Sequence, residues 1–135
     1  MTYPITDIGG LDEEAAAALK SIGIRTTEKL LEAAKSPKGR KALALKIGVD
    51  ERQLLCWANA ADRMRVKGLG RDYAELLQAA GVDTVKELKY RNPERLAKAM
   101  AAANAKRKLV RLLPSDKAVV RWIENAKKLP LKISY

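Results

Sequence analysis

The residues best suited to ligand chemistry form a short glycine turn at positions 66–71, with the sequence VKGLGR. Glycine tolerates a positive φ and lets another backbone approach closely, so this spacing is typical of a tight turn between two helices. The first N–H groups of the second helix have no acceptor within that helix, and they lie at the positive end of its dipole. Such a helix start is a ready-made phosphate site, and Lys67 and Arg71 place two cations beside it.

Two helices have to hold this turn. Residues 50–65 before it and residues 71–80 after it have apolar side chains at helical spacing. The segment 80–84, with the sequence AGVDT, closes the second helix at its glycine. Thr84, with Glu87 three residues later, is typical of the capping box that begins a further helix.

The hairpin occurs twice. Residues 8–30 align with residues 66–88 at a shift of 58 without a gap, with seven identities in 23 positions. The likeness continues at a shift of 65, where residues 50–64 match residues 115–129. Both of these later segments carry a tryptophan on an apolar helical stripe, which indicates a core residue rather than a stacking platform for bases. The sequence therefore predicts an internal repeat.

Caps and breakers predict the remaining helices, and alanine and leucine favour helix throughout. The predicted helices are about 12–22, 26–35, 36–48, 50–65, 71–80, a short one from 84, 92–103, an ambiguous 104–112, and 115–129. We expect an all-α fold, a compact bundle of about eight or nine short helices built from two helix-hairpin-helix-containing repeats. The expected domain is a single one over residues 1–135, with repeat units of about 5–65 and 66–130 that share the helix 50–65.

The glycine turn, its flanking helices and its closing segment resemble the helix-hairpin-helix superfamily. The resemblance covers residues 66–88 well and residues 8–30 in part, and the tandem arrangement also resembles a bacterial family of uncharacterised proteins. It implies that backbone N–H groups of the turn bind consecutive nucleic-acid phosphates with little base readout. The residues that it marks are Gly68, Leu69, Gly70 and Arg71, with Lys67 as a flanking cation. The same hairpin also serves as a packing or protein-docking unit, and this alternative stays open.

The first copy departs from the pattern. Asp12 stands where the second copy has Gly70, and Glu13 stands where it has Arg71. Carboxylates in the first turn of a helix interact favourably with the positive end of its dipole, and they repel phosphate. We therefore expect the first hairpin to be structural or to bind a protein, and its adjacent carboxylates to cap a helix rather than to hold a metal.

The charge distribution follows the same asymmetry. The chain has 27 basic and 16 acidic residues, a net charge of +11 that favours polyanionic partners. Residues 1–34 have a net charge of −3, and residues 104–135 have one of +7. If 104–112 is helical, Arg107 and Arg111 lie on one face and form a basic stripe of the kind that contacts a nucleic-acid backbone. A solvated charged face is the alternative.

The composition favours a binding protein over an enzyme. Histidine, the commonest general base and metal ligand, is absent, and Cys56 is the single cysteine. We expect Cys56 to be an inert, buried or half-buried thiol. We expect no catalytic residue, no metal site and no cofactor. The chain has neither a leader-like segment nor an apolar run long enough for a bilayer, so we expect no membrane contact and a cytoplasmic location.

The function that these patterns predict is non-sequence-specific binding of nucleic acid, DNA ahead of RNA. Backbone amides of the second hairpin turn and the C-terminal basic stripe would provide the contacts. The alternative is a protein-interaction scaffold whose hairpins dock a partner, at the acidic first hairpin above all, without nucleic-acid binding. The oligomeric state does not follow from the sequence.

Overall fold

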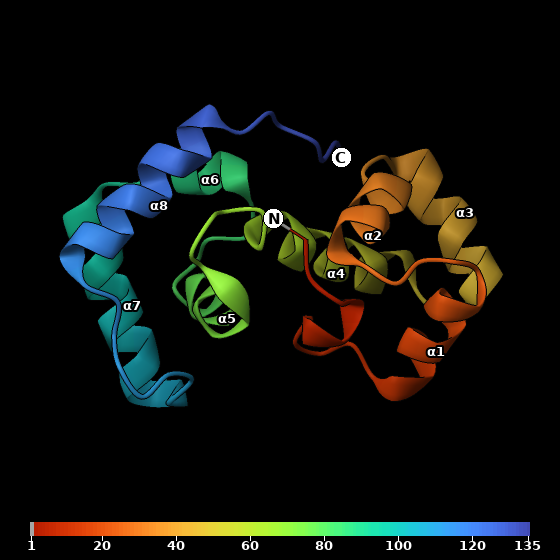
Figure 1. The fold of residues 1–135 in the computed structure, drawn as a ribbon, viewed down its shortest axis with the longest axis horizontal. Coiled ribbons are helices and arrows are strands. Elements are labelled where there is room, and N and C mark those ends of the chain that lie inside the picture. The colour runs from red at the N-terminus through yellow and green to blue at the C-terminus, as the bar shows by residue number, and fades with distance from the viewer. Residues whose placement is uncertain (1) are drawn as a thin grey trace. The chain divides into compact units, whose positions relative to one another are not determined.

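The computed structural model describes residues 2–135, and this part of the chain is all-helical (Figure 1). Its elements are, in order, the 3-10 helix η1 (Ile5–Asp7) and the helices α1 (Glu13–Ser21), α2 (Thr27–Ala34), α3 (Pro37–Ile47), α4 (Glu51–Arg63), α5 (Gly70–Ala79), α6 (Val85–Lys89), α7 (Pro93–Arg107) and α8 (Asp116–Lys128). Within the described residues, β-type pairing is limited to an isolated bridge between Pro4 and Thr26. The predicted all-α fold class, a bundle of about eight helices, is confirmed.

Side-chain caps determine where most of these helices begin. Every described α-helix except α5 follows a residue whose side chain accepts a hydrogen bond from a first-turn backbone N–H. The capping residues are Asp12, Thr26, Ser36, Asp50, Thr84, Asn92 and Ser115. Proline begins α3 and α7, where its missing N–H sacrifices no intrahelical bond. The helix starts predicted at these caps are confirmed.

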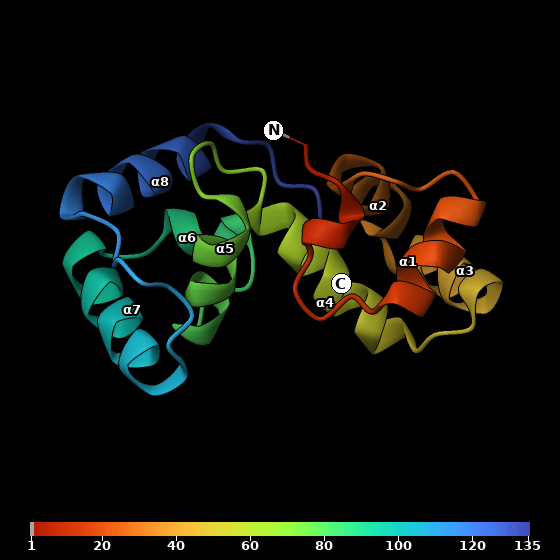
Figure 2. The same ribbon diagram turned by 60° about the horizontal axis from the view of Figure 1, so that its bottom comes forward.

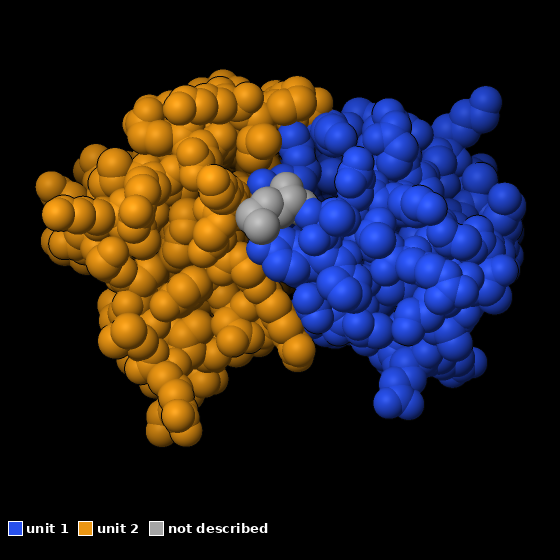
Figure 3. Space-filling model, in the orientation of Figure 1, with its two compact units in different colours: residues 1–65, 132–135 blue, residues 66–131 orange. Residues whose placement is uncertain are grey.

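The chain divides into two compact units, coloured separately in Figure 3. Unit 1 contains the chain up to Arg65 together with Lys132–Tyr135, and unit 2 contains Val66–Leu131. In unit 1, α2 packs on α3 and α4, and α1 packs on α3 (Figures 1 and 2). In unit 2, α6 and α7 pack on α8, and α5 packs on α7. A single domain that shares the helix 50–65 stays a prediction.

Each unit has its own apolar core. Fully buried leucines from successive helices form most of it, and each unit adds one tryptophan that is 3% exposed. The larger core residues are Leu19, Leu30, Leu54 and Trp57 in unit 1, and Leu77, Leu88, Met100 and Trp122 in unit 2. Burying a side chain of this size stabilises the fold by about 1.5–3 kcal/mol relative to leaving it exposed. The predicted core position of both tryptophans is confirmed.

The connection between α7 and α8 differs from the expected helix over 104–112. The helix α7 ends at Arg107, because Lys108 adopts a left-handed conformation with φ of +50°. The backbone N–H and carbonyl of Val110, which would bond to other backbone groups if the helix continued, bond instead to the side chain of Asn104. Its amide nitrogen donates to the Val110 carbonyl at 3.1 Å, and its oxygen accepts from the Val110 N–H at 3.0 Å. Residues 108–115 are therefore a tethered loop.

The C-terminal residues 132–135 are held to the rest of unit 1 by hydrogen bonds. The backbone N–H of Ser134 donates to the carbonyl of Lys35 at 2.8 Å. Arg40 is only 6% exposed, and its guanidinium donates to the carbonyls of Ser134 at 2.7 Å and of Ala34 at 2.9 Å. Arg40 thus joins the end of α2 to the C-terminal segment.

Three further observations concern the described chain outside the two hairpin turns. Among residues 2–135 no helix is long and apolar enough to cross a membrane, and no group of three or more potential metal-ligating side chains is found. Cys56 is exposed, so the expectation of a buried or half-buried thiol is wrong. It lies beside the apolar stripe of α4 that contains Leu54 and Trp57, and the helical period directs it to solvent.

Candidate functional site

The turn between α4 and α5 has the conformation that its two glycines allow. Gly68 and Gly70 have φ of +83° and +69°, a left-handed region that side chains with a Cβ rarely occupy. The N–H of Leu69 donates to the carbonyl of Val66 at 3.2 Å and closes the turn. Leu69 is 2% exposed, so it anchors the turn in the core while Lys67 stays exposed.

The helix that follows this turn begins without a side-chain cap in the described structure. Its N-cap residue is Leu69, whose side chain has no hydrogen-bonding group. The first N–H groups of any helix lack intrahelical acceptors, so those of α5 are left for an external one. Arg71 and Asp72 are both exposed in this first turn, and the carboxylate of Asp72 offsets part of the helix dipole. Nearby cations are therefore important for holding an anion here.

The aligned turn in unit 1 matches the second turn at its first glycine but differs at the helix start, where Asp12 has φ of −77° and Gly70 has φ of +69°. Gly10 has φ of +83°, the value found at Gly68, and the N–H of Leu11 donates to the carbonyl of Ile8 at 3.3 Å. The next residue, Asp12, caps α1 by accepting from a first-turn N–H at 2.7 Å. The first hairpin therefore satisfies its own helix start, whereas the second does not.

A groove of about 830 Å³ lies beside the second turn, and we call it the hairpin groove. Its lining residues are Lys67, Gly68, Tyr73, Leu112, Leu113, Pro114, Ser115, Ala118, Arg121, Trp122 and Asn125. They come from the turn, from α5, from the 108–115 loop and from α8. Of the described residues that line it, the charged ones are Lys67 and Arg121, and both are cations. The groove thus combines positive charge with an apolar loop.

Aromatic packing holds the walls of the hairpin groove together. The rings of Tyr73 and Trp122 have centroids 5.2 Å apart at an interplanar angle of 48°. The Tyr73 hydroxyl donates to the carbonyl of Leu112 at 2.9 Å. A Cβ on Gly68 would lie 3.9 Å from Nε1 of Trp122, which shows how closely the turn approaches α8. These contacts hold the turn, α5, the loop and α8 around the groove.

The residues predicted from the turn have separate locations around this site. Lys67 and Gly68 line the hairpin groove, and Leu69 is buried beneath the turn as expected. Gly70 begins α5 with a positive φ, and Arg71 is exposed one residue later. These locations are consistent with a surface at which an anion could contact backbone N–H groups and the cations Lys67 and Arg71.

The two arginines expected to form a basic stripe do not share a helical face. Arg107 is the last residue of α7, and Arg111 lies in the loop after Lys108 has ended the helix. Both side chains are exposed, but neither is among the described residues that line the hairpin groove. The stripe is therefore corrected to two separate exposed cations.

Two polar residues of the groove, Arg121 and Asn125, were missed by the sequence analysis. They flank the buried Trp122 on α8, one residue before it and three residues after it. Helical periodicity shows that both border the buried stripe, but it does not show which turn lies opposite. At the shift of 65, their counterparts in α4 are Cys56 and Ala60. The cation and the amide are therefore specific to unit 2.

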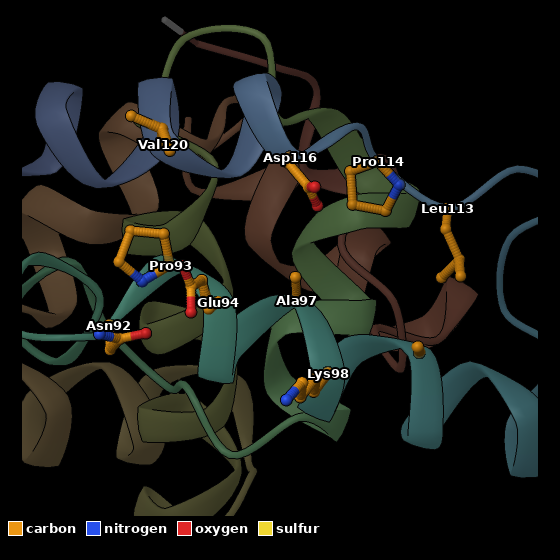
Figure 4. Close-up of a pocket in the computed structure, with 10 residues that line it drawn as sticks. Asn92, Pro93, Glu94, Ala97, Lys98, Leu113, Pro114, Asp116 and Val120 are labelled. Atoms are coloured by element: carbon orange, nitrogen blue, oxygen red, sulfur yellow. The ribbon is translucent and has the colours of Figure 1, made fainter.

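A second groove, of about 800 Å³, lies between α7 and α8, and we call it the α7–α8 groove (Figure 4). Its apolar lining residues are Pro93, Ala97, Ala101, Leu113, Pro114 and Val120, and its polar ones are Asn92, Glu94, Lys98 and Asp116. Leu113 and Pro114 line both grooves. The carboxylates of Glu94 and Asp116 make this second groove unsuitable for a phosphate.

The architecture places the chain among all-α proteins, with its hairpin turns and grooves formed by short capped helices. The chain belongs to the family described as Domain of unknown function (DUF4332), whose model matches residues 9–129. This match spans both hairpins and α8. Neither a curated protein nor a solved structure matches the chain.

Proposed function

We propose that the chain binds nucleic acid, DNA ahead of RNA, without sequence specificity and at the hairpin turn of unit 2. One observation carries the proposal: Lys67 and Gly68 share a groove with Arg121, beside a helix start that has no side-chain cap. Backbone N–H groups at a helix start bind one phosphate, and adjacent cations attract its neighbours. Contacts of this kind position a protein on the nucleic-acid backbone without reading bases.

The distribution of charge supports this choice of unit. Unit 2 has 15 lysines and arginines against seven aspartates and glutamates, so it carries a net charge of +8 out of the total of +11. Arg107 and Arg111 belong to this charge, and we assign them a role in long-range attraction rather than in the groove itself. The proposal includes no catalytic step.

The difference between the hairpins supports it further. At the positions aligned with Gly70 and Arg121, unit 1 has Asp12 and Cys56. The first hairpin thus keeps the first glycine of the turn but has a carboxylate at the helix start, and unit 1 has a cysteine where unit 2 has Arg121. We infer that nucleic-acid binding belongs to the second hairpin alone.

Fluorescence anisotropy with a labelled DNA duplex at several salt concentrations tests the proposal. If Lys67, Arg71 and Arg121 contact three phosphates, the association constant falls roughly 40-fold between 50 and 200 mM salt. Binding that is absent at 50 mM salt, or that does not change with salt, would contradict the proposal.

A matched pair of variants at Gly70 then locates the site. Asp and Asn both tolerate a positive φ, so Gly70→Asp and Gly70→Asn impose similar backbone strain but differ by one charge. We expect Gly70→Asp to bind the duplex about tenfold more weakly than Gly70→Asn, a difference of about 1.4 kcal/mol. Equal affinities of the two variants would exclude phosphate binding at this helix start.

The α7–α8 groove favours a second candidate function, a protein-interaction scaffold. Val120 is 43% exposed and Leu113 is 41% exposed at this groove, so an apolar surface is available to a partner. On this proposal the chain retains a protein partner whose binding Val120→Asp abolishes, and it shows no salt-dependent affinity for DNA. Duplex binding that depends on Gly70, as described above, would favour the first function.

A further inference from the structure

We propose that the hairpin groove binds an unpaired nucleobase, so that the protein prefers DNA with a single-stranded end over a closed duplex. This inference rests on the proposed function, because a phosphate held at the turn places the adjoining nucleotide beside Lys67 and Gly68. It adds a ligand class that backbone contacts alone do not require.

The size of the groove is the first reason. A phosphate needs only the surface of the turn and the ends of two or three cations. The hairpin groove is open to solvent and has a volume of about 830 Å³, within the size range of clefts that hold small organic ligands. Lys67 and Arg121 supply its charge, so it suits an organic group that carries a phosphate.

The apolar edge of the groove is the second reason. Leu112 is 77% exposed and Leu113 is 41% exposed, and both line the groove with Pro114. Exposed aliphatic side chains beside two cations offer an apolar surface to the flat face of a base while the cations hold its phosphate. The hydrogen bond from Tyr73 to Leu112 fixes this edge in place before the ligand arrives. Little ordering of the loop is then needed on binding.

A polar group on α8 is the third reason. Asn125 is half-buried on α8, and its amide has both a donor and an acceptor. The hydrogen-bonding edge of an unpaired base needs partners of both kinds. In a closed duplex these edges are paired and the faces are stacked, and a base has to be extruded before it can enter such a site. A frayed or single-stranded end presents the base without that cost.

Charge distinguishes this groove from its neighbour. The α7–α8 groove shares Leu113 and Pro114, but Glu94 and Asp116 line it, and these carboxylates repel the phosphate of a nucleotide. The hairpin groove is lined by cations alone among the charged residues that the structure describes. The nucleotide is therefore assigned to the hairpin groove.

The experiment compares two labelled DNA ligands by anisotropy at low salt, a blunt duplex and the same duplex with a four-nucleotide single-stranded overhang. We expect the wild-type chain to bind the overhang ligand about tenfold more tightly. The groove variants Leu112→Ser and Asn125→Ala should lower this ratio to about one. Leu45→Ser is the matched control, because Leu45 is 80% exposed in unit 1, and it should keep the ratio of the wild type. Circular dichroism checks that each variant is folded.

The possible results distinguish failure of the nucleobase site from failure of the proposed nucleic-acid binding. Equal wild-type affinities for the two ligands would overturn the nucleobase site and leave the proposed function intact. A preference for the overhang that survives in both groove variants would also overturn it, because the preference would then arise elsewhere. Failure to bind either ligand would contradict the proposed function itself, and the nucleobase site with it.

Discussion

The hydroxyl of Tyr73 donates a 2.9 Å hydrogen bond to the carbonyl oxygen of Leu112. This bond joins the first turn of α5 to the loop that follows α7, two segments that are far apart in the chain. The ring of Tyr73 also packs against Trp122 of α8. One side chain thus connects three of the segments that form the hairpin groove.

Replacing Tyr73 by phenylalanine removes the hydrogen bond and keeps the ring contact with Trp122. We expect Tyr73→Phe to lower the free energy of unfolding by about 1 kcal/mol, the usual net contribution of one such bond. Urea unfolding followed by circular dichroism measures the change. Tyr90→Phe is the control, because Tyr90 is 75% exposed, and a surface change of this kind has an effect of about 0.5 kcal/mol or less. Equal effects of the two variants would contradict the assigned role of the Tyr73 bond.

Arg40 holds the C-terminal segment against unit 1 through the carbonyls of Ala34 and Ser134. Arg40→Met keeps much of the aliphatic packing but leaves these two acceptors without their donor. We expect the free energy of unfolding to fall by about 2 kcal/mol, since an unsatisfied buried acceptor such as the Ala34 carbonyl costs about 1–3 kcal/mol, whereas water can reach the carbonyl of the exposed Ser134. The exposed neighbour Lys41 provides the control Lys41→Met, and thermal or urea unfolding compares the two. A loss of less than about 1 kcal/mol for Arg40→Met would show that water replaces the guanidinium.

Gly10 and Gly68 form a matched pair for separating stability from binding. Both have φ of +83°, and an added Cβ finds no atom within 4 Å at Gly10 and only Nε1 of Trp122 at 3.9 Å at Gly68. Alanine at either position should therefore cost about the same, roughly 1–2 kcal/mol, for the left-handed backbone. Chemical unfolding of the two variants tests this equality, and duplex binding should weaken for Gly68→Ala only. Weaker binding in Gly10→Ala would assign a role in DNA binding to the first hairpin as well.

Glu32 has a pKa below its ordinary value, because the Lys35 ammonium donates a hydrogen bond to its carboxylate and also stabilises the negative charge. Since the pKa is lowered in the folded state, the stabilisation is present above the unfolded pKa and is lost as pH falls through the folded one. Lys35→Met should raise the pKa of Glu32 toward its ordinary value. Carboxyl chemical shifts followed by NMR across the acidic range measure this change. Lys38→Met is the control and should leave the titration of Glu32 in place; a Glu32 pKa that is the same with and without Lys35 would refute the assignment.

Helix starts were predictable because their signals are local. A cap at Ser36 or Asn92 followed by proline involves atoms within a few residues of one another, so the sequence contains the whole interaction. The end of α7 was not predictable in this way. Residues 104–112 have a helical composition, but the side chain of Asn104 pairs with Val110 after Lys108 turns left-handed. Residues 108–112 therefore form a loop, although their composition favours a helix.

By itself the sequence determined the all-α class, most helix starts, the two glycine turns and the burial of both tryptophans, because these features depend on residues within a turn or two of helix. Only the tertiary structure decided which side chains meet at the second turn. Lys67 and Arg121 are far apart in the chain, and the packing of α6 and α7 on α8 determines where Arg121 and Asn125 lie. Periodicity shows which face of a helix is buried, but the partner opposite that face depends on the packing of the whole unit.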